Sequence, residues 1–342
     1  MKKGCVLAKT NRMYRRCAKA AGASLALLAV GTAFFYSYSV VRRPERKKNK
    51  KNYGKYEAQM REGIRWFRSQ NPEKIYIKSE DGLNLFAYYL PADEPGRKLI
   101  LMMHGYRAEE LADFSNLYRS FHEAGYDLLV PSQRSHGASE GRYICFGVKE
   151  REDCLRWAQY AADRFGEACS LYLAGISMGA ATVLMAAGLP LPGNVKGILA
   201  DCGYTSPRAI LSHVLRRNFH LPPFPFMNLT EWVTRRRAGF GYLDADTLDV
   251  MKRCQIPVLF IHGGADDFVP VEMTMENYRA CTAPKELLII EGAGHAASSL
   301  KDKETYVNTA LRFMQKAETW AVREGGEGSA EESGKKERGS EE

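Results

Sequence analysis

The sequence predicts an α/β protein: a mostly parallel, twisted sheet with an antiparallel N-terminal hairpin, helices on both faces and a small helical cap insertion. Continuous apolar runs separated by helical patterns predict the parallel sheet. The segment KIYIKSEDGLNLFAYYLPA predicts the hairpin, because two strand-like stretches meet at Asp81-Gly82. With 45% apolar residues, the chain of 342 residues is long enough to bury a large core.

The elements follow in order along the chain. Apolar runs predict buried strands at 98–105, 126–131, 170–175, 195–201, 256–263 and 286–292. Helical patterns predict helices at 113–125, with Asp113 as N-cap, and at about 147–165, 180–188, 271–281 and 302–318. Together with the hairpin, they make residues 74–320 the main domain.

Two segments depart from this alternation. Residues 203–250 are rich in aromatic residues, proline and arginine, and we expect them to form a cap above the carboxyl ends of the strands. For the cap arginines, a solvated face is preferred over contact with an anionic or lipid-surface substrate; they are Arg216, Arg217, Arg235, Arg236 and Arg237. Residues 321–342 are charged, rich in glycine and serine and nearly free of apolar side chains, which predicts disorder.

The N-terminus carries the positive charge of the chain. Residues 1–51 hold 14 Lys/Arg and one acidic residue, whereas the other residues hold 35 basic and 39 acidic ones. Between the basic tail 1–19 and a basic linker at 42–54, residues 20–41 form an uncharged apolar run of 22 residues, long enough for a membrane-spanning helix. A basic terminus fits nucleic acid or a membrane. The apolar run selects the membrane, and we expect no nucleic-acid partner.

An uncleaved single-pass anchor in the cell membrane is the preferred interpretation of this run. The alternative is a signal peptide cleaved near Ser37 or Ser39, but the run is long for one and a basic stretch follows at once. Seven Lys/Arg lie on each side of the run. Because a short basic tail is costly to translocate and a large domain is not, we expect the main domain on the outer side. Within 42–73, residues 55–69 predict an amphipathic helix.

The stretch LYLAGISMGA predicts a reactive serine. Gly175-Ile176-Ser177-Met178-Gly179 alone is weak evidence, but a strand precedes it and a helix-compatible segment follows, as a nucleophile elbow requires. In so tight a turn, side chains at Gly175 and Gly179 would collide. Ser177 would then lie at a helix N-terminus, where the dipole favours negative charge.

A serine nucleophile needs a base, and the base needs an acid to orient it. Of the seven histidines, His295 follows the last predicted strand, at the sheet edge where the serine emerges. His104 and His262 are interpreted as structural residues at strand ends. Asp266, in HGGADDFVP, is the preferred acid over its neighbour Asp267. Asp201, at the end of a strand, is a third candidate, interpreted as a hydrogen-bonding residue of the strand end.

The tetrahedral intermediate of acyl transfer needs backbone N–H donors. Met178, directly after the serine, is predicted to supply one, and Tyr106 in HGYR the other. The eight cysteines include no CxxC pair and no Cys/His cluster at metal-ligand spacing. We therefore expect neither a metal nor a cofactor.

With these landmarks in order, the chain resembles the α/β-hydrolase superfamily. HGYR, RSHGASEG, GISMG, HGGADDFVP and GAGH match it over about residues 75–318. The run RSHGASEGRYICFGVKEREDCLRW looks most like that of bacterial, often membrane-anchored members near the monoacylglycerol-lipase-like and Bem46-like groups. The chain order Ser177, Asp266, His295 agrees with the superfamily. Because serine stands where dehalogenases and epoxide hydrolases carry aspartate, those activities are not expected.

We therefore expect a serine hydrolase that acts on small acyl substrates. It would cleave carboxylic esters or related acyl compounds through an acyl-enzyme intermediate. An aminopeptidase, a thioesterase or an acyltransferase are alternatives within the fold. An aminopeptidase would need an acidic group for the substrate amine, and nothing singles out Glu231 or Asp244. A non-catalytic, membrane-tethered scaffold is the rival from another class.

Overall fold

The computed structural model describes the backbone of residues 2–43, 54–95, 97–109 and 111–336. Within these ranges it describes side-chain burial and contacts from residue 18 to residue 320. They fall into two units. One comprises Met1–Val41 and Leu211–Gly241, and the other comprises Arg42–Ile210 and Tyr242–Glu342.

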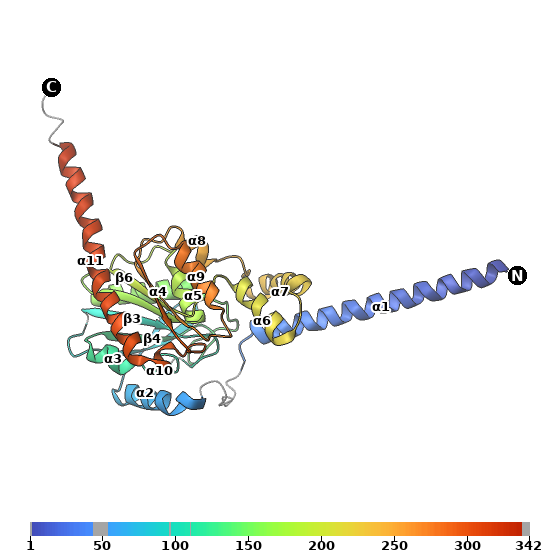
Figure 1. Ribbon diagram of the computed structural model, residues 1–342, viewed down its shortest axis with the longest axis horizontal. Helices are drawn as coiled ribbons and strands as arrows, with labels where there is room; N and C mark the ends of the chain where they lie inside the picture. The colour runs from blue at the N-terminus through green and yellow to red at the C-terminus, as the bar shows by residue number, and fades with distance from the viewer. Residues whose placement is uncertain (1, 44–53, 96, 110, 337–342) are drawn as a thin grey trace, which may run out of the picture. The chain divides into compact units, whose positions relative to one another are not determined.

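The larger unit is built on an eight-stranded sheet with the order β1-β2-β4-β3-β5-β6-β7-β8 (Figure 1). The strands are β1 (Glu73–Lys78), β2 (Asn84–Leu90), β3 (Lys98–Met103), β4 (Asp127–Ser132), β5 (Ser170–Ile176), β6 (Val195–Asp201), β7 (Val258–Gly263) and β8 (Lys285–Ile290). β1 and β2 pair antiparallel, β2 pairs antiparallel with β4, and every other pair is parallel. The predicted hairpin and the predicted parallel strands are confirmed.

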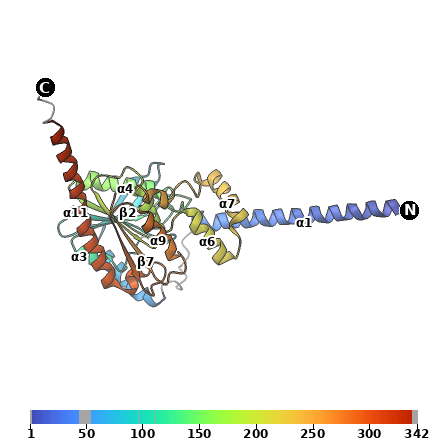
Figure 2. The same cartoon turned by 45° about the horizontal axis from the view of Figure 1, so that its top comes forward.

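Helices cover both faces because successive side chains of each strand point to opposite faces. On β3, Leu99, Leu101 and Met103 join one core cluster, whereas Ile100 and Met102 join the other. The first cluster lies under α4 (Glu150–Phe165), α5 (Met178–Ala186), α8 (Thr247–Met251) and α9 (Val271–Ala280). The second lies under α2 (Glu57–Ser69), α3 (Tyr118–Glu123) and α11 (Lys303–Lys336), and Figure 2 shows α3 and α11 on the same side of the sheet.

The amphipathic helix expected at 55–69 is α2, preceded by a 3-10 turn at Gly54–Tyr56. Its buried residues are Met60 and Phe67, from the predicted apolar stripe. At Gly63, a Cβ would lie 1.8 Å from the Ser115 carbonyl oxygen, so the helix packs closely against the loop before α3.

The helix expected at 113–125 is shorter than predicted, and the N-cap assignment of Asp113 is wrong. α3 begins only at Tyr118. The Asp113 carboxylate instead accepts a hydrogen bond from the N–H of Gly105, at 2.7 Å. This partner lies eight residues earlier in the same connection between β3 and α3, and the hydrogen bond to it prevails over the local helical pattern.

The smaller unit joins the N-terminal helix to the middle of the predicted cap. α1 (Lys2–Ser39) packs with α7 (Pro223–Ala238), and the rings of Phe34, Phe35 and Tyr38 meet that of Phe219 at the end of α6 (Pro207–Phe219). Gly31 allows the close approach of α7, because a Cβ there would lie 2.9 Å from the Phe226 ring. Residues 211–241 therefore share a unit with the predicted anchor.

Within α1, Ala18–Ser39 is apolar and long enough to cross a membrane. A signal sequence near an N-terminus can have the same length and apolar composition, so these two properties alone do not distinguish it from an anchor. The N-terminal tail is part of this helix, whereas residues 44–53 of the predicted linker lie outside the described residues.

At the other end, α11 continues to Lys336, and the disorder expected for residues 321–342 stays a prediction. Residues 337–342 lie outside the described residues.

Candidate active site

Ser177 occupies the sharp turn between β5 and α5. Its backbone has φ 56° and ψ −114°, the left-handed side of φ that non-glycine residues seldom adopt. A Cβ at Gly175 would lie 2.2 Å from the Gly179 carbonyl oxygen, and one at Gly179 would lie 1.8 Å from the Met103 carbonyl oxygen. Both positions therefore require glycine, for the steric reason that the sequence argument gave.

The structure brings Ser177, His295 and Asp266 together. His295 Nε2 lies 2.9 Å from Ser177 Oγ, and its Nδ1 lies 2.8 Å from Asp266 Oδ2. The carboxylate accepts the Nδ1–H, so Nε2 is free of a proton and accepts the serine hydroxyl. Ser177 is 6% exposed. The site is thus a shielded hydroxyl in contact with a base that a carboxylate orients.

Asp266 is held by four donors. Its Oδ1 accepts the N–H groups of Phe268 and Val269 at 2.9 and 3.0 Å. Its Oδ2 lies 3.3 Å from His262 Nε2 in addition to the contact with His295. Burial alone would raise the pKa of this carboxyl, but the hydrogen bonds from His262 and His295 outweigh it and hold the pKa well below its ordinary value. Asp266 is therefore a fixed anion.

His262 was interpreted as a structural strand-end residue, and it is completely buried at the end of β7. Its Nδ1 lies 2.7 Å from Thr274 Oγ1, and its Nε2 lies 3.0 Å from the Val269 carbonyl oxygen. Burial opposes its protonation, yet the neighbouring Asp266 carboxylate raises the pKa of His262. The chain of contacts with Asp266 is one that sequence spacing did not reveal.

The two other acid candidates are placed differently. Asp267 is exposed, whereas the adjacent Asp266 carboxylate accepts the Nδ1–H of His295. Asp201 is buried at the end of β6, where its Oδ1 accepts the Ser298 hydroxyl at 3.0 Å. Burial raises the pKa of Asp201 to about 6. The hydrogen-bonding role preferred for Asp201 agrees with this contact.

The two residues predicted as oxyanion donors flank the serine. Met178 is the first residue of α5 and directly follows Ser177. Tyr106 directly follows Gly105, at which a Cβ would lie 3.4 Å from the Cβ of Ser177. The Asp113 carboxylate accepts the Gly105 N–H, and this hydrogen bond restrains the loop next to Tyr106. Sequence reasoning assigned Asp113 to a helix end and so missed this contact.

The loop after β4 also binds the segment around Tyr106, through hydrogen bonds to Arg107 and His104. His136 Nε2 accepts the N–H of Arg107 at 2.9 Å, and its Nδ1 lies 2.9 Å from the Arg134 carbonyl oxygen. Gln133 donates to the His104 carbonyl oxygen, and its own N–H donates to His104 Nε2 at 3.0 Å. Burial lowers the pKa of His136 to about 3, so the ring stays neutral and keeps an acceptor for Arg107.

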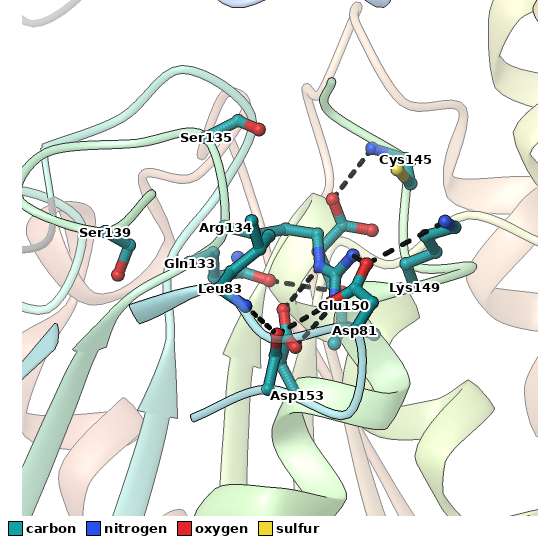
Figure 3. Close-up of polar contacts among 12 residues, drawn as sticks. Asp81, Leu83, Gln133, Arg134, Ser135, Ser139, Cys145, Lys149, Glu150 and Asp153 are labelled. Atoms are coloured by element: carbon teal, nitrogen blue, oxygen red, sulfur yellow. Dashed lines mark hydrogen bonds and ion pairs between the residues drawn. The ribbon is translucent and has the colours of Figure 1, made fainter. Parts of the chain in front are cut away.

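A buried ion-pair network fixes the start of this loop (Figure 3). The guanidinium of Arg134 binds Asp153 through Nε at 2.6 Å and Nη2 at 2.7 Å, and also binds Asp81. The side chains of Arg134 and Asp153 are 3% and 2% exposed. Beside them, Glu150 accepts the N–H groups of Cys145 and Gly147. The pairs tie the β1–β2 turn, the loop and α4 together.

One group of side chains has the spacing of metal ligands. Ligand atoms of Cys202, Asp266 and His295 lie within 4.8 Å of one another. Asp266 and His295 already bind each other, and His295 also contacts Ser177. Burial raises the pKa of the Cys202 thiol well above its ordinary value. A thiolate is the metal-binding form of cysteine, so this set fits a metal poorly. The expected absence of a metal and a cofactor stays a prediction.

Comparison with known proteins matches the chain to one family and to several bacterial relatives. The sequence profile of the prolyl oligopeptidase family matches residues 124–319. The protein YqkD of Bacillus subtilis is 28% identical over 249 residues, which cover 72% of this chain and 81% of YqkD. YfhR of Salmonella typhimurium is 24% identical over 255 residues, which cover 72% of this chain and 82% of YfhR.

Solved structures share the fold at low sequence identity. The Pyrococcus furiosus esterase Pf2001 superimposes with a TM-score of 0.62 at 18% identity, over 81% of this chain and 98% of the esterase. Est1E of Butyrivibrio proteoclasticus, solved with ferulic acid, gives 0.57 at 20% identity, over 72% and 99%. Porphyromonas gingivalis dipeptidyl peptidase 4 gives 0.54 at 19% identity, over 72% of this chain and 35% of the peptidase.

Proposed function

Because the chain belongs to the prolyl oligopeptidase family of α/β-hydrolases and is thus a hydrolase, we propose that it is a serine hydrolase of carboxylic esters or related acyl compounds. The observation that carries the proposal is the unbroken hydrogen-bond chain from Asp266 through His295 to Ser177. This arrangement activates a hydroxyl that is otherwise a poor nucleophile at neutral pH.

In the proposed reaction, Ser177 Oγ attacks the carbonyl carbon while its proton passes to His295 Nε2. The oxygen of the tetrahedral intermediate accepts hydrogen bonds from the N–H groups of Met178 and Tyr106. His295 then protonates the leaving alcohol, and an acyl-enzyme remains. Water, deprotonated by the same imidazole, releases the acid and restores the serine. Asp266 stays ionised throughout and stabilises the imidazolium.

Aromatic rings near the serine support an apolar group in the substrate. Tyr106 stacks on Phe146 at 5.3 Å between ring centres, and Phe268 lies 4.9 Å from the His295 ring. An ester with an apolar acyl group fits these surroundings, and esterases are among the proteins of similar fold.

A peptidase is the second candidate, because the matched family is the prolyl oligopeptidase family. The same three residues cleave amides when the leaving amine is protonated by the base. Thioester hydrolysis and acyl transfer use the same acyl-enzyme and differ in the group that enters or leaves. A non-catalytic scaffold is disfavoured by the complete set of three side chains.

For location, we propose that Ala18–Ser39 is an uncleaved membrane anchor. Its length and apolar composition support this. The main domain is proposed to lie on the outer side, since translocating a short basic tail is costly. Resistance of the full chain to carbonate extraction, with α1 still attached by mass spectrometry, would support the anchor. Release of a chain that starts after residue 39 would indicate a signal peptide instead.

The test of the enzyme proposal uses the full chain in detergent with a fluorophosphonate probe. Wild-type protein should be labelled and Ser177→Ala should not. Absence of labelling in folded wild type would contradict the proposal. A panel of p-nitrophenyl esters of rising chain length, alongside aminoacyl-p-nitroanilides, then separates ester from peptide chemistry. Faster cleavage of the anilides would favour the peptidase.

A further inference from the structure

The smaller unit contains a groove whose lining suits a lipid. We propose that the groove between α1 and α7 binds one anionic phospholipid, with an acyl chain along the groove and the phosphate at Arg236 and Arg237. This goes beyond the proposed hydrolase activity, and it rests on the proposal that Ala18–Ser39 is inserted in a membrane.

The groove has a volume of about 750 Å³. Its α1 wall consists of Leu25, Leu28, Ala29, Thr32, Ala33 and Tyr36, and its α7 wall consists of Leu229, Trp232, Val233, Arg236 and Arg237. Both walls are thus mostly apolar, and the two arginines lie in the last turn of α7. An apolar channel with charge at one end matches the chemistry of a single phospholipid molecule.

The two arginines are available for a phosphate. Among the described residues, no carboxylate is recorded within ion-pair distance of Arg236 or Arg237, whereas the preceding Arg235 lies 3.7 Å from Glu231 on the same helix. The Arg236 guanidinium lies over the Trp232 ring, 5.0 Å from its centre. This stacking restricts the side chain while leaving its N–H groups for a ligand. Guanidinium groups bind phosphate oxygens through two parallel hydrogen bonds.

The position of the groove along α1 indicates that it faces lipid. Every α1 residue of its wall belongs to the apolar segment Ala18–Ser39. Large apolar side chains on the same part of α1 and on α7 are exposed, including Leu25, Val30 and Trp232 at 67%, 68% and 59%. If the segment spans a bilayer, its exposed side chains meet lipid, and tryptophan with arginine suits the headgroup region. The neighbour of the groove is then lipid.

The negative charge of the proposed lipid follows from the unpaired arginines. A zwitterionic headgroup carries its own cation, whereas an anionic one leaves its phosphate for the protein. Each basic side chain near a membrane surface favours anionic lipid by roughly 1 kcal/mol, or about fivefold. Phosphatidylglycerol is the probe that represents this class.

The experiment measures quenching of Trp232 by lipids with brominated acyl chains. Full-length protein is reconstituted in phosphatidylcholine vesicles that contain brominated phosphatidylglycerol or, at equal mole fraction, brominated phosphatidylcholine. The signal of Trp232→Phe is subtracted, which removes the other three tryptophans. Wild type should favour phosphatidylglycerol about fivefold or more. The double variant Arg236→Gln/Arg237→Gln should lose this preference. The control Arg216→Gln/Arg217→Gln, with the same charge change on α6, should keep it.

Equal quenching by the two lipids in wild type would overturn the proposal, as would a preference that survives in Arg236→Gln/Arg237→Gln. Displacement of the effect by millimolar glycerol phosphate would assign the arginines to a soluble anion. Lipid-independent cross-linking of Trp232→Cys chains would assign the groove to a second copy. Carbonate extraction of the vesicles reports failure of the anchor, which also overturns the proposal. Fluorophosphonate labelling in the same vesicles reports the hydrolase site separately.

Discussion

His136 accepts a hydrogen bond from the backbone N–H of Arg107, with 2.9 Å between nitrogen atoms. Arg107 is one of few non-glycine residues with a left-handed backbone, at φ 54°, and it directly follows the proposed oxyanion donor Tyr106. A strained backbone persists only where its surroundings hold it. The imidazole is therefore a brace for the segment that carries one of the two donors.

Replacing His136 by alanine should lower kcat by about 10- to 100-fold and leave KM for a p-nitrophenyl ester within a few-fold. The reason is partial misplacement of one oxyanion donor, whose complete loss costs roughly 10²–10³. His136→Asn, which keeps an acceptor, should recover part of kcat. His122→Ala, on the surface of α3, is the control. A change in KM alone would contradict a role in placing the donor.

Asp266→Asn should reduce kcat by roughly 10³–10⁴-fold, because an amide does not select the productive tautomer of His295. Asp267→Asn should retain most of the activity, since it is Asp266 that accepts the N–H groups of Phe268 and Val269 and the Nδ1–H of His295. Both variants remove one negative charge from adjacent positions, so they control for each other. The opposite ranking in steady-state ester hydrolysis would transfer the role to Asp267.

Asp201 predicts a pH dependence of stability. Burial raises its folded-state pKa to about 6, above the ordinary value of 3.8. A raised carboxyl pKa favours the protonated form in the folded state. Its contribution is therefore full below pH 3.8 and is lost as pH rises to 6, by about 3 kcal/mol at most. Asp201→Asn should flatten this dependence in urea unfolding at pH 4 to 7.

The same variant tests the alternative acid. Asparagine still accepts the Ser298 hydroxyl, so Asp201→Asn should keep esterase activity within about tenfold of wild type. A loss as large as that of Asp266→Asn would make Asp201 the acid that orients His295.

Gly179→Ala should destabilise the fold by about 3 kcal/mol or more, because the new Cβ meets the backbone oxygen of Met103 rather than a side chain that can move. Gly193→Ala is the matched control, since a Cβ there meets nothing within 4 Å. Urea unfolding followed by tryptophan fluorescence measures the difference. Equal stability of the two variants would mean that the turn relaxes more easily than its contacts indicate.

Arg134→Gln should destabilise the protein by about 3–5 kcal/mol, because it leaves the buried Asp153 carboxylate without its cation. Arg119→Gln removes an equivalent pair with Glu123 that is about 60% exposed on both sides, and should cost less than about 1 kcal/mol. The Arg134 variant should also lower kcat, since the carbonyl oxygen of Arg134 holds His136. An effect on stability alone would separate the network from the site.

The parallel strands could be predicted from sequence because a strand buried on both faces is apolar along most of its length, as β3, β5 and β7 are. The serine turn was predictable for a similar reason, since its steric demands fall on glycines within two residues. His295 and Asp266 followed from their places after adjacent strands. Local pattern was sufficient in each case.

Contacts that depend on how the loops fold could not be predicted. Asp113 resembled a helix cap because its partner, the Gly105 N–H, is identified only by the folded loop. His136 resembled an ordinary loop residue, although it joins Arg107 to Arg134. The packing of α1 with residues 211–241 depends on a close approach at Gly31 that no periodicity marks.

The shared unit of α1 and residues 211–241 bears on how the protein can be produced. Deleting the first 41 residues, the usual route to a soluble enzyme, would remove the side chains that cover Phe219 and the apolar wall of α7. The shortened chain would then expose the apolar surfaces of α6 and α7 and aggregate during expression. Purification of the whole chain in detergent, or substitution of polar residues on that wall, is the sounder route to biochemistry.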